Sequence, residues 1–365
     1  PAIQLGIASA PMVASRGCRA SCSFCSIAPF SRLSTGPRRR ARSVAAIAAE
    51  MATLWREQGV RCFVFHDDDF FAGPLEEDRQ RFASLRAEMA AQGLPRVALV
   101  VKARPDDIHE ATLLELKKAG LVRLFLGIET DAVAGQRALG RCLDPADNRR
   151  ALALLHCHDI FVCSNLLLWE PDTTLADLRA NLELMAAFPE QLFNLARTEP
   201  YEGAPLTRRL ERQGRLLGDY LGRDYLVADP RAELAWRLFR VALGERCYPL
   251  HGVVNCAMGL ACDAAMLRHF HPSELSEALA TEVAELVRRQ ASSTRRWLAS
   301  IVDYAAQCPL EPSPELLLHA LDLGRAVRAE DAELLADMAT LSAALERSVA
   351  PLATEVPLGV AARRR

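Results

Sequence analysis

Residues 16–26 read Arg16-Gly-Cys-Arg-Ala-Ser-Cys-Ser-Phe-Cys-Ser26 and place Cys18, Cys22 and Cys25 in a C-x3-C-x2-C pattern. Three thiols this close together are typical of a loop that binds a metal or an iron–sulfur cluster. Three cysteines can hold three irons of a four-iron cluster, which leaves the fourth iron free for chemistry. A structural zinc would need a fourth Cys or His nearby, and none follows within a short loop. Zinc and a purely electron-transferring cluster are the alternatives.

The composition is that of a large globular chain. Its 365 residues are 50% hydrophobic and 25% charged with a net charge of −2, so we expect about two domains and no general nucleic-acid or membrane-surface partner. No apolar run reaches the roughly 18 residues of a membrane-spanning helix, and residues 1–6 lack the pattern of a secretory signal. The 11 cysteines, three of them clustered, indicate a metal site in a reducing compartment, which predicts a cytoplasmic location.

Short apolar runs alternate with helical periods from residue 3 to about residue 200. Helices are expected between the runs, for example over 44–55 with Ser43 as N-cap and Gly59 as the end. Continuous apolar strands separated by helices favour a parallel sheet with right-handed crossovers. Six such units are too few for an eight-stranded barrel. The predicted fold class is therefore α/β, an open, partial (β/α)6 barrel with reactive groups at the carboxyl ends of its strands. The runs predict strands at residues 3–13, 60–65, 97–101, 121–128, 160–168 and 192–196. Further helices are expected over residues 106–119, 145–156 and 174–185.

The alternation of strands and helices stops after about residue 205. The remaining sequence has helical periods at residues 233–243, 273–290, 295–307 and 314–345. We therefore expect residues 1–205 to form the barrel and residues 206–365 to form a mostly helical region that covers the barrel mouth. Specificity for the substrate should reside in that region and in the loops at the mouth.

The cysteine spacing, the aromatic Phe24 directly before Cys25, and the position of the cluster after the first strand resemble the radical S-adenosylmethionine (SAM) superfamily. The resemblance extends over roughly residues 3–205. It implies a [4Fe-4S] cluster whose open iron binds the amino and carboxylate groups of SAM. An electron from the reduced cluster would cleave SAM to methionine and a 5′-deoxyadenosyl radical, which removes a hydrogen atom from the substrate. The implied partners are a small-molecule or peptide substrate and a reductant of the flavodoxin or ferredoxin type.

Polar residues at other strand ends match the family by position. The resemblance implies that Asp67 or Asp68 binds the ammonium of SAM, and that Glu129 contacts its ribose or amine. Asn165 would reach the ribose, and Arg197 would clamp the carboxylate with its planar guanidinium. The alternative for each is a surface carboxylate or a strand-end ion pair. The expected cofactor-binding set is Phe24, Asp67, Asp68, Lys102, Arg104, Glu129, Asn165 and Arg197.

Three further segments resemble one branch of the superfamily that usually carries a cobalamin-binding domain before the barrel. They are residues 103–108 (ARPDDI), 126–130 (LGIET) and 168–174 (LWEPDTT). Members of that branch methylate unreactive carbons or catalyse ring contractions and cyclisations. Such a domain would precede the first strand, and this chain begins at the first strand, so the use of cobalamin stays open. A cobalamin-linked C-methyltransferase is accordingly an alternative function.

The remaining cysteines and tyrosines have weaker patterns. Cys247, Cys256 and Cys262 could form a second cluster, but their C-x8-C-x5-C spacing and apolar neighbours favour buried structural thiols. Tyr201, Tyr248 and Cys256 are candidate hydrogen donors to a substrate radical. A function of a different class, a non-catalytic iron–sulfur electron carrier or sensor, is also consistent with the Cys18–Cys25 cluster.

Overall fold

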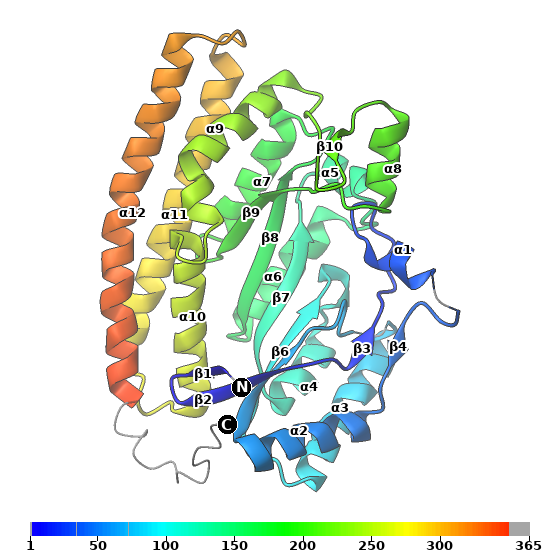
Figure 1. Ribbon diagram of the computed structural model, residues 1–365. Helices are drawn as coiled ribbons and strands as arrows, with labels where there is room; N and C mark the ends of the chain where they lie inside the picture. Colours follow the sequence, from blue (N-terminus) through cyan, green and yellow to red (C-terminus); the bar gives the residue numbers. More distant parts are fainter. Residues whose placement is uncertain (1, 34, 72, 350–365) are drawn as a thin grey trace, which may run out of the picture.

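The computed structural model describes residues 2–33, 35–71 and 73–349. Within them, a seven-stranded sheet with the order β1-β2-β5-β6-β7-β8-β9 curls into a half-barrel (Figure 1). One layer of helices covers the outside of the sheet, and a bundle of long C-terminal helices packs against it (Figure 1). The architecture confirms the predicted α/β class with a helical C-terminal region.

Six of these strands are parallel and follow one another in chain order across the sheet. Because a crossover returns the chain to the same end of the sheet each time, the carboxyl ends of all six strands lie at one edge. That edge is where the cysteine-bearing segment lies. The strands are β2 (Ile7–Met12), β5 (Val60–Phe65), β6 (Ala98–Ala103), β7 (Leu121–Glu129), β8 (Phe161–Trp169) and β9 (Phe193–Arg197).

The first strand expected at residues 3–13 is a hairpin. β1 (Ala2–Gln4) pairs antiparallel with β2, and Leu5 and Gly6 form the turn with φ angles of 49° and 73°. The prediction missed this turn because Leu5 adopts a left-handed conformation that usually belongs to glycine. The apolar pattern of the segment does not reveal it.

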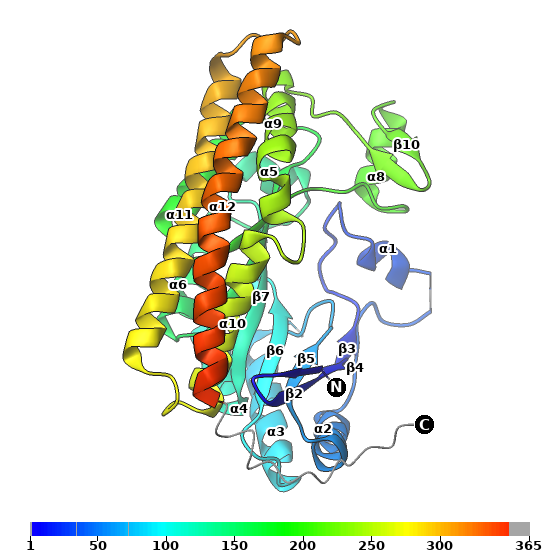
Figure 2. The same cartoon turned by 60° about the vertical axis from the view of Figure 1, so that its left-hand side comes forward.

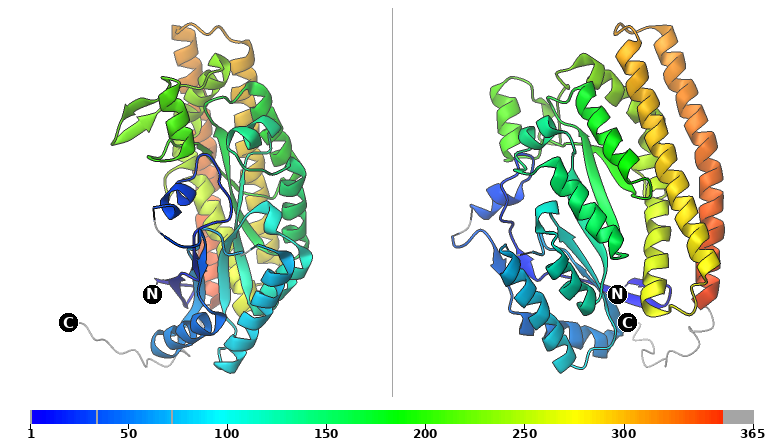
Figure 3. Two further views of the ribbon diagram at one scale, coloured as in Figure 1. Left: turned by 90° about the vertical axis from the view of Figure 1, so that its right-hand side faces the viewer. Right: turned by 180° about the vertical axis from the view of Figure 1, so that it is seen from behind.

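The helices outside the barrel begin and end at recognisable signals. The Ser43 hydroxyl accepts the Ala46 amide at the start of α2, and Gly59 ends it with a φ of 67°, as predicted. The helix expected over residues 106–119 starts later, because Pro105–Asp107 forms a separate 3-10 turn (η1) and Ile108 is extended. Figure 3 (right) shows this layer in front of the sheet. Its members are α2 (Val44–Gln58), α3 (Leu75–Ala91), α4 (Glu110–Ala119), α6 (Pro145–Cys157) and α7 (Leu175–Ala187).

The two faces of the sheet carry different side chains. Successive residues of a strand point to opposite faces, so Phe63, Leu99 and Leu124 all face the outer helices and are fully buried. The alternate positions face the inside of the half-barrel and are partly polar. On β6, for example, Lys102 faces inward. The strands thus combine an apolar outer face with a polar lining at the inner face.

The region after residue 205 begins with α8 (Pro205–Arg212) and a small hairpin of β10 (Leu217–Asp219) and β11 (Gly222–Asp224). Figure 2 shows this part beside the cysteine-bearing segment, with the long helices α11 and α12 running together on the other side. Among these helices, α10 contacts β7, β8 and β9, and α11 packs on α7. The long helices are α9 (Pro230–Cys247), α10 (Val253–Phe270), α11 (Glu277–Gln307) and α12 (Pro314–Val349).

Two expectations for the helical region were wrong. The helices expected at 273–290 and 295–307 are one helix, α11, because the buried residues Ser293 and Thr294 continue it without a glycine or proline. The helix α10 was not expected at all, because its apolar and cysteine residues lie on several faces and give no clear period. None of the helices within the described part of the chain is long and apolar enough to cross a membrane.

A buried ion pair holds the helical bundle together. Arg246 of α9 is fully buried, and its Nε donates to the Asp331 carboxylate of α12 at 2.7 Å. Its Nη1 donates to the Ser293 hydroxyl of α11 at 2.9 Å. One guanidinium therefore links three helices.

We expect Asp331→Ala to lower the free energy of unfolding by about 3–5 kcal/mol, because it leaves the Arg246 charge buried without a partner. Urea unfolding followed by circular dichroism measures the loss. Asp322→Ala is the control, since Asp322 pairs with Arg325 at the surface, and we expect it to cost less than about 0.5 kcal/mol. Equal effects of the two variants would contradict this role of Arg246.

Candidate active site

The three clustered cysteines lie on an irregular segment at the carboxyl edge of the sheet. This cysteine loop, residues 17–26, connects β3 (Ser15–Arg16) to α1 (Ile27–Ser31). Cys22 is buried, whereas Cys18 and Cys25 are half-buried. A loop without regular structure has no backbone ladder of its own, so other elements must fix its shape.

Carboxylates after β5 hold the start of the cysteine loop. Asp67 is fully buried and accepts the Ala14 amide at 2.9 Å and the Ser15 hydroxyl at 2.5 Å. Asp68 accepts the Gly17 amide at 2.7 Å. One of the two, Asp67 or Asp68, was expected to bind the ammonium of SAM. The structure shows them bonded to the chain that leads into the cysteines, so they position the loop.

Gly17 is required by a close approach of two backbone segments. Its φ is 87°, and a Cβ at this position would lie 1.9 Å from the Arg38 carbonyl oxygen. Only glycine fits both the left-handed conformation and the contact. The β3–β4 pair, with β4 at Arg40–Ala41, therefore crosses close to the first cysteine.

The centre of the loop is held by two helices. The Ser23 amide donates to the Leu139 carbonyl at 2.8 Å, directly after α5 (Val133–Ala138). The Ser23 carbonyl accepts the Leu206 amide at 2.8 Å, in the first turn of α8. The cysteine loop is thus tied both to the barrel and to the region after residue 205.

Each of the three sulfurs receives an N–H donor. The Cys18 sulfur accepts the Ala20 amide at 3.4 Å, and the Cys25 sulfur accepts the Ile27 amide at 3.5 Å. The Cys22 sulfur accepts Nη1 of Arg104 at 3.5 Å. Hydrogen bonds to sulfur stabilise the anionic thiolate and set the potential of an iron–sulfur cluster.

Burial makes these thiols reluctant to ionise alone. It raises the pKa of Cys18 to about 11, with the neighbouring Asp69 carboxylate as a second cause, and it also raises the pKa of Cys25. A bound metal centre reverses this preference, because a coordinated thiol is deprotonated. Buried thiols that accept N–H hydrogen bonds are therefore better suited to bind a cluster than to act as free acids or bases.

No three Cys, His, Asp or Glu side chains converge on a point where they could share one metal ion, among residues 2–33, 35–71 and 73–349. A cubane cluster makes a different demand, since each cysteine binds a different iron and the sulfurs surround the cluster at a distance from one another. The three thiols with their N–H donors suit this second arrangement.

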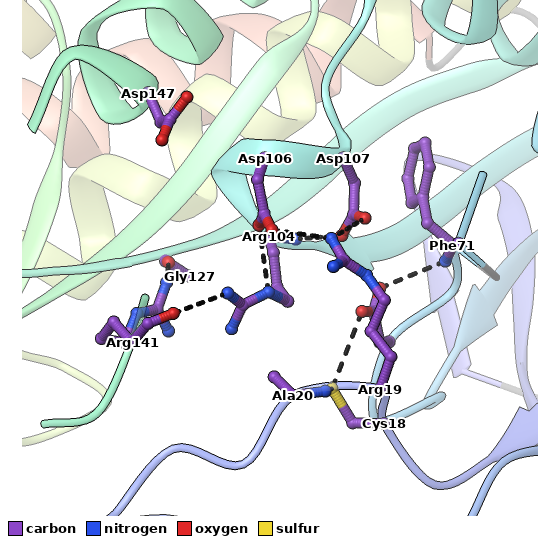
Figure 4. Close-up of polar contacts among 12 residues, drawn as sticks. Cys18, Arg19, Ala20, Phe71, Arg104, Asp106, Asp107, Gly127, Arg141 and Asp147 are labelled. Atoms are coloured by element: carbon purple, nitrogen blue, oxygen red, sulfur yellow. Dashed lines mark hydrogen bonds and ion pairs between the residues drawn. The ribbon is translucent and has the colours of Figure 1, made fainter. Parts of the chain in front are cut away.

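Asp69 was missed by the sequence analysis. Its Oδ2 lies 3.7 Å from the Cys18 sulfur, and its Oδ1 accepts the Phe71 amide at 3.2 Å (Figure 4). Burial, followed by the nearby Asp107, raises the pKa of Asp69 to about 7. The run of three aspartates at residues 67–69 was the available signal, but spacing alone does not show which one meets a cysteine.

Charged residues surround the loop on the β6 and β7 side. The guanidinium of Arg104 bridges the Cys22 sulfur, the Asp106 carboxylate at 3.0 Å and the Arg141 carbonyl at 3.0 Å (Figure 4). Arg19 in the cysteine loop pairs with Asp106 and Asp107 at 2.8 and 2.6 Å. Arg104 was expected here, whereas Arg19 and Arg141 were not, because no pattern marked them.

Glu129 ends β7 in a left-handed conformation with a φ of 64°. Its carboxylate lies 3.6 Å from Nη1 of Arg141, and burial raises its pKa. A non-glycine residue with this backbone geometry is uncommon and is concentrated at functional sites. The turn aims Glu129 back toward the loop instead of along the strand.

The remaining expected residues are three on the strands and one in the cysteine loop. Lys102 lies on β6 two residues before Arg104, and Asn165 pairs with Asn194 across β8 and β9. Arg197 stacks on the Tyr225 ring at 3.8 Å and pairs with Asp224 at 3.3 Å. Phe24 packs on the hydrophobic core from the cysteine loop.

A cavity of about 730 Å³ opens at the end of β9, between α9 and the β10–β11 hairpin. Arg197, Tyr201, Trp236 and Tyr248 are among the residues that line it. The pKa of Tyr201 is raised by burial and by the neighbouring Glu199. The cavity is large enough for a drug-sized molecule.

Cys247 lies on α9, and Cys256 and Cys262 lie on α10. Cys247 is buried beside Arg246 in the bundle, and Cys262 contacts Arg123 of β7 at 3.9 Å. Cys256 is half-buried. That the three are structural thiols stays a prediction.

Residues 12–185 match the family model described as the radical SAM superfamily. The chain is 29% identical over 212 residues to the anaerobic magnesium-protoporphyrin IX monomethyl ester cyclase of Cereibacter sphaeroides, covering 57% of this chain and 33% of that protein. It is 24% identical over 229 residues to an uncharacterized methyltransferase of Pyrococcus horikoshii, covering 63% of this chain and 48% of that protein. The chain thus spans a third to a half of these curated relatives.

Solved structures extend the similarity into the helical region. The apo form of the cobalamin-dependent SAM radical enzyme OxsB superposes with a TM-score of 0.62 at 14% identity, covering 94% of this chain and 58% of OxsB. The same enzyme with aqua-cobalamin bound gives a TM-score of 0.58, with 93% and 54% covered. At this level of identity, the likeness shows a shared fold.

Glu170, in the 168–174 segment, links this site to α8. It is buried at the end of β8, where its Oε2 accepts the Asp172 amide at 3.0 Å and lies 3.8 Å from Nη2 of Arg209. Burial raises its pKa to about 7. A raised pKa means that the folded state favours the protonated form of the Glu170 carboxyl. The stability that this protonated carboxyl contributes is therefore present at low pH and is lost as the pH rises through about 7.

We expect the free energy of unfolding of the wild type, relative to Glu170→Gln, to fall by up to about 3 kcal/mol between pH 4.5 and pH 8, because the variant does not titrate. Denaturant unfolding of both proteins across this range measures the difference. Parallel pH profiles would show that the carboxyl is not held in its protonated form.

Proposed function

Because residues 12–185 belong to the radical SAM superfamily, a superfamily of enzymes, we propose that the protein is a radical SAM enzyme in which Cys18, Cys22 and Cys25 hold a [4Fe-4S] cluster. The observation that carries the proposal is the cysteine loop itself. Its three thiols lie within the matched segment, and each sulfur accepts an N–H donor. The fourth iron of the cluster, which none of these three cysteines binds, would bind SAM.

When bound, the cluster supplies an electron to SAM, whose cleavage gives methionine and a 5′-deoxyadenosyl radical that removes a hydrogen atom from an unactivated carbon of the substrate. The chain's own residues set the conditions for this chemistry. Arg104 places a cation at the Cys22 sulfur and stabilises its negative charge. Asp67 and Asp68 fix the backbone of the loop before the first cysteine.

We infer the SAM contacts from position. Asp68 is exposed, and its carboxylate can still accept a hydrogen bond from the ammonium of SAM. Both oxygens of Asp67 already accept hydrogen bonds from the protein. Glu129 and its partner Arg141 lie beside Arg104 and suit the polar groups of the nucleoside. The other proposed SAM contacts, from the strands and the cysteine loop, are Phe24, Lys102, Asn165 and Arg197.

The substrate that we propose is a small molecule of natural-product type or a peptide. The support is the cavity at the end of β9, which borders the cysteine loop through Tyr201. Its aromatic residues and arginines suit an organic molecule with polar substituents. Tyr201 is half-exposed there and could return a hydrogen atom to a substrate radical.

A cobalamin-linked C-methyltransferase is the second candidate. It is favoured by the shared fold with OxsB, a cobalamin-dependent SAM radical enzyme. Tight binding of methylcobalamin to the protein, followed by absorbance, would select this candidate. A reductant of the flavodoxin or ferredoxin type is proposed for either function, and the 11 free cysteines support a reducing, cytoplasmic setting.

Reductive cleavage of SAM tests the proposed function. After anaerobic reconstitution with iron and sulfide, the protein with SAM and dithionite should produce 5′-deoxyadenosine, measured by liquid chromatography. Cys18→Ala, Cys22→Ala and Cys25→Ala should each reduce the product to the level of the enzyme-free blank. Cys157→Ala, which removes an exposed cysteine outside the loop, should leave it unchanged.

A reconstituted cluster that accepts an electron without yielding any nucleoside would overturn the enzyme assignment. That result would support the alternative of an electron carrier or sensor. Nucleoside formation that survives all three cysteine substitutions would instead show that the cluster is held elsewhere.

The hydrogen bonds that Ala14 and Ser15 donate to the Asp67 carboxylate give a further prediction; we call this contact the Asp67 tether. Asp67→Ala leaves the Ala14 amide buried without its acceptor, at a cost of about 1–3 kcal/mol, and leaves the Ser15 hydroxyl only the Asp69 carbonyl at 3.3 Å. We therefore expect the protein to retain much less iron after reconstitution. Asp144→Ala is the matched control, because it removes an exposed helix cap far from the loop in sequence. Full iron content in Asp67→Ala would contradict the tether.

A further inference from the structure

A second cavity, of about 370 Å³, lies inside the half-barrel between the inner face of the sheet and α10. Strands β5, β6 and β7 form one wall, α10 forms another, and the β1–β2 hairpin also borders the cavity through Gln4, Leu5, Ile7 and Ser9. Most of the lining is apolar, but two cations face it. The lining includes Val64, Val100, Lys102, Arg123, Phe125 and Met266. A mostly apolar cavity with a few placed polar groups is the usual form of a small-molecule site.

The cavity lies directly below the cysteine loop along β6. Inward-facing residues on a strand are two apart, so Val100, Lys102 and Arg104 follow one another at steps of roughly 7 Å. The last of them, Arg104, contacts the Cys22 sulfur at 3.5 Å. On β7, the Glu129 carboxylate and the Arg141 guanidinium lie over Gly127, between the cavity residue Phe125 and the cysteine loop. The cavity and the cysteine loop thus border the same inner face of β6 and β7.

Arg123 carries a positive charge that no described acid neutralises. Its guanidinium contacts the Cys262 sulfur at 3.9 Å and the Cys163 thiol, and it lies over the Phe161 ring at 5.7 Å, while its Nε is buried without a hydrogen-bond partner. Burial raises the pKa of Cys262 to about 11 and also raises that of Cys163, so both thiols are neutral. A desolvated cation beside neutral groups is costly unless an anion joins it.

Lys102 adds a second cation at the same place. Within the residues that the structure describes, no acceptor lies within ion-pair distance of its ammonium. In the register of β6 and β7, Val100 lies beside Arg123 and Lys102 beside Phe125. The two cations are thus diagonal neighbours on one face, with Cα atoms roughly 8 Å apart from strand spacing and rise. Their long side chains can meet one ligand group.

The acid at the far side of the cavity does not supply the missing anion. Asp263 of α10 also borders the cavity, but its carboxylate accepts the Gln4 amide. Burial, followed by Glu346, raises the pKa of Asp263 to about 6. The structure records no ion pair between Asp263 and either cation among the described residues.

We infer that the cavity binds an apolar molecule carrying one carboxylate or similar anionic group, with its anion at Lys102 and Arg123 and its apolar body against Val64, Phe125 and Met266. This inference rests on the proposed function, because it narrows the substrate class of that enzyme, and it places the substrate in this cavity instead of the one at the end of β9. It places the reacting carbon toward Arg104 and the cysteine loop, at the open end of the cavity. Lys102, expected among the SAM contacts, would then be a substrate-binding residue.

Calorimetric titration of the full chain with octanoate and with the neutral analogue octanamide tests the inference. Without reductant no SAM is cleaved, so the result is independent of the proposed reaction. We expect octanoate to bind at least about tenfold more tightly than octanamide, as a charge-assisted hydrogen bond provides. Lys102→Gln should abolish this preference and Lys102→Arg should keep it, whereas the exposed Lys118→Gln should change nothing.

Two further binding experiments show where the ligand binds. Met266→Trp fills the cavity and should weaken the binding of both probes, with circular dichroism as the check on folding. Saturating SAM should leave the affinity for octanoate unchanged within about twofold if the anion belongs to the substrate. Competition by SAM would assign the cations to the SAM carboxylate and overturn the inference. Equal binding of the two probes, or no saturable binding, would overturn it as well.

If the protein binds octanoate as expected but forms no 5′-deoxyadenosine, the proposed function fails and the cavity remains a site for anionic ligands. If it forms 5′-deoxyadenosine but does not discriminate between the probes, only the assignment of the substrate class fails.

Discussion

The buried carboxylate of Asp67 is the contact on which the geometry of the site depends. It accepts the Ala14 amide and the Ser15 hydroxyl, and so joins the end of β5 to the segment that leads into the cysteines. The cysteine loop has no regular structure, and its remaining bonds reach α5 and α8. A loop held at both its start and its centre can present three thiols without the rigidity of a helix or strand.

The parallel sheet explains why the site forms where it does. All six parallel strands end at one edge, so acids and arginines that are far apart in sequence meet there. Arg104 is the clearest case, since its guanidinium touches a cysteine sulfur, an aspartate and a backbone carbonyl at once. The low dielectric of the buried edge strengthens these contacts and raises the pKa of Asp69 and Glu129.

Features with a local cause could be predicted from the sequence. The strand at residues 60–65, the cap at Ser43 and the three-cysteine motif were of this kind, because each depends on neighbours in the chain. Contacts between distant segments could not be predicted. Nothing in the sequence shows that Asp67 bonds to the backbone of Ala14, or that Arg141 lies beside Arg104. The helix α10 was missed for the same reason, because its burial against β7–β9 comes from tertiary packing.

The central claim is that the cysteine loop holds a cluster with one iron open to SAM. The most direct measurement is the electron paramagnetic resonance spectrum of the reconstituted, dithionite-reduced protein, recorded with and without SAM. We predict the signal of a reduced [4Fe-4S] cluster whose shape changes when SAM is added, since SAM would occupy the open iron. A cluster signal that is identical with and without SAM would contradict the claim.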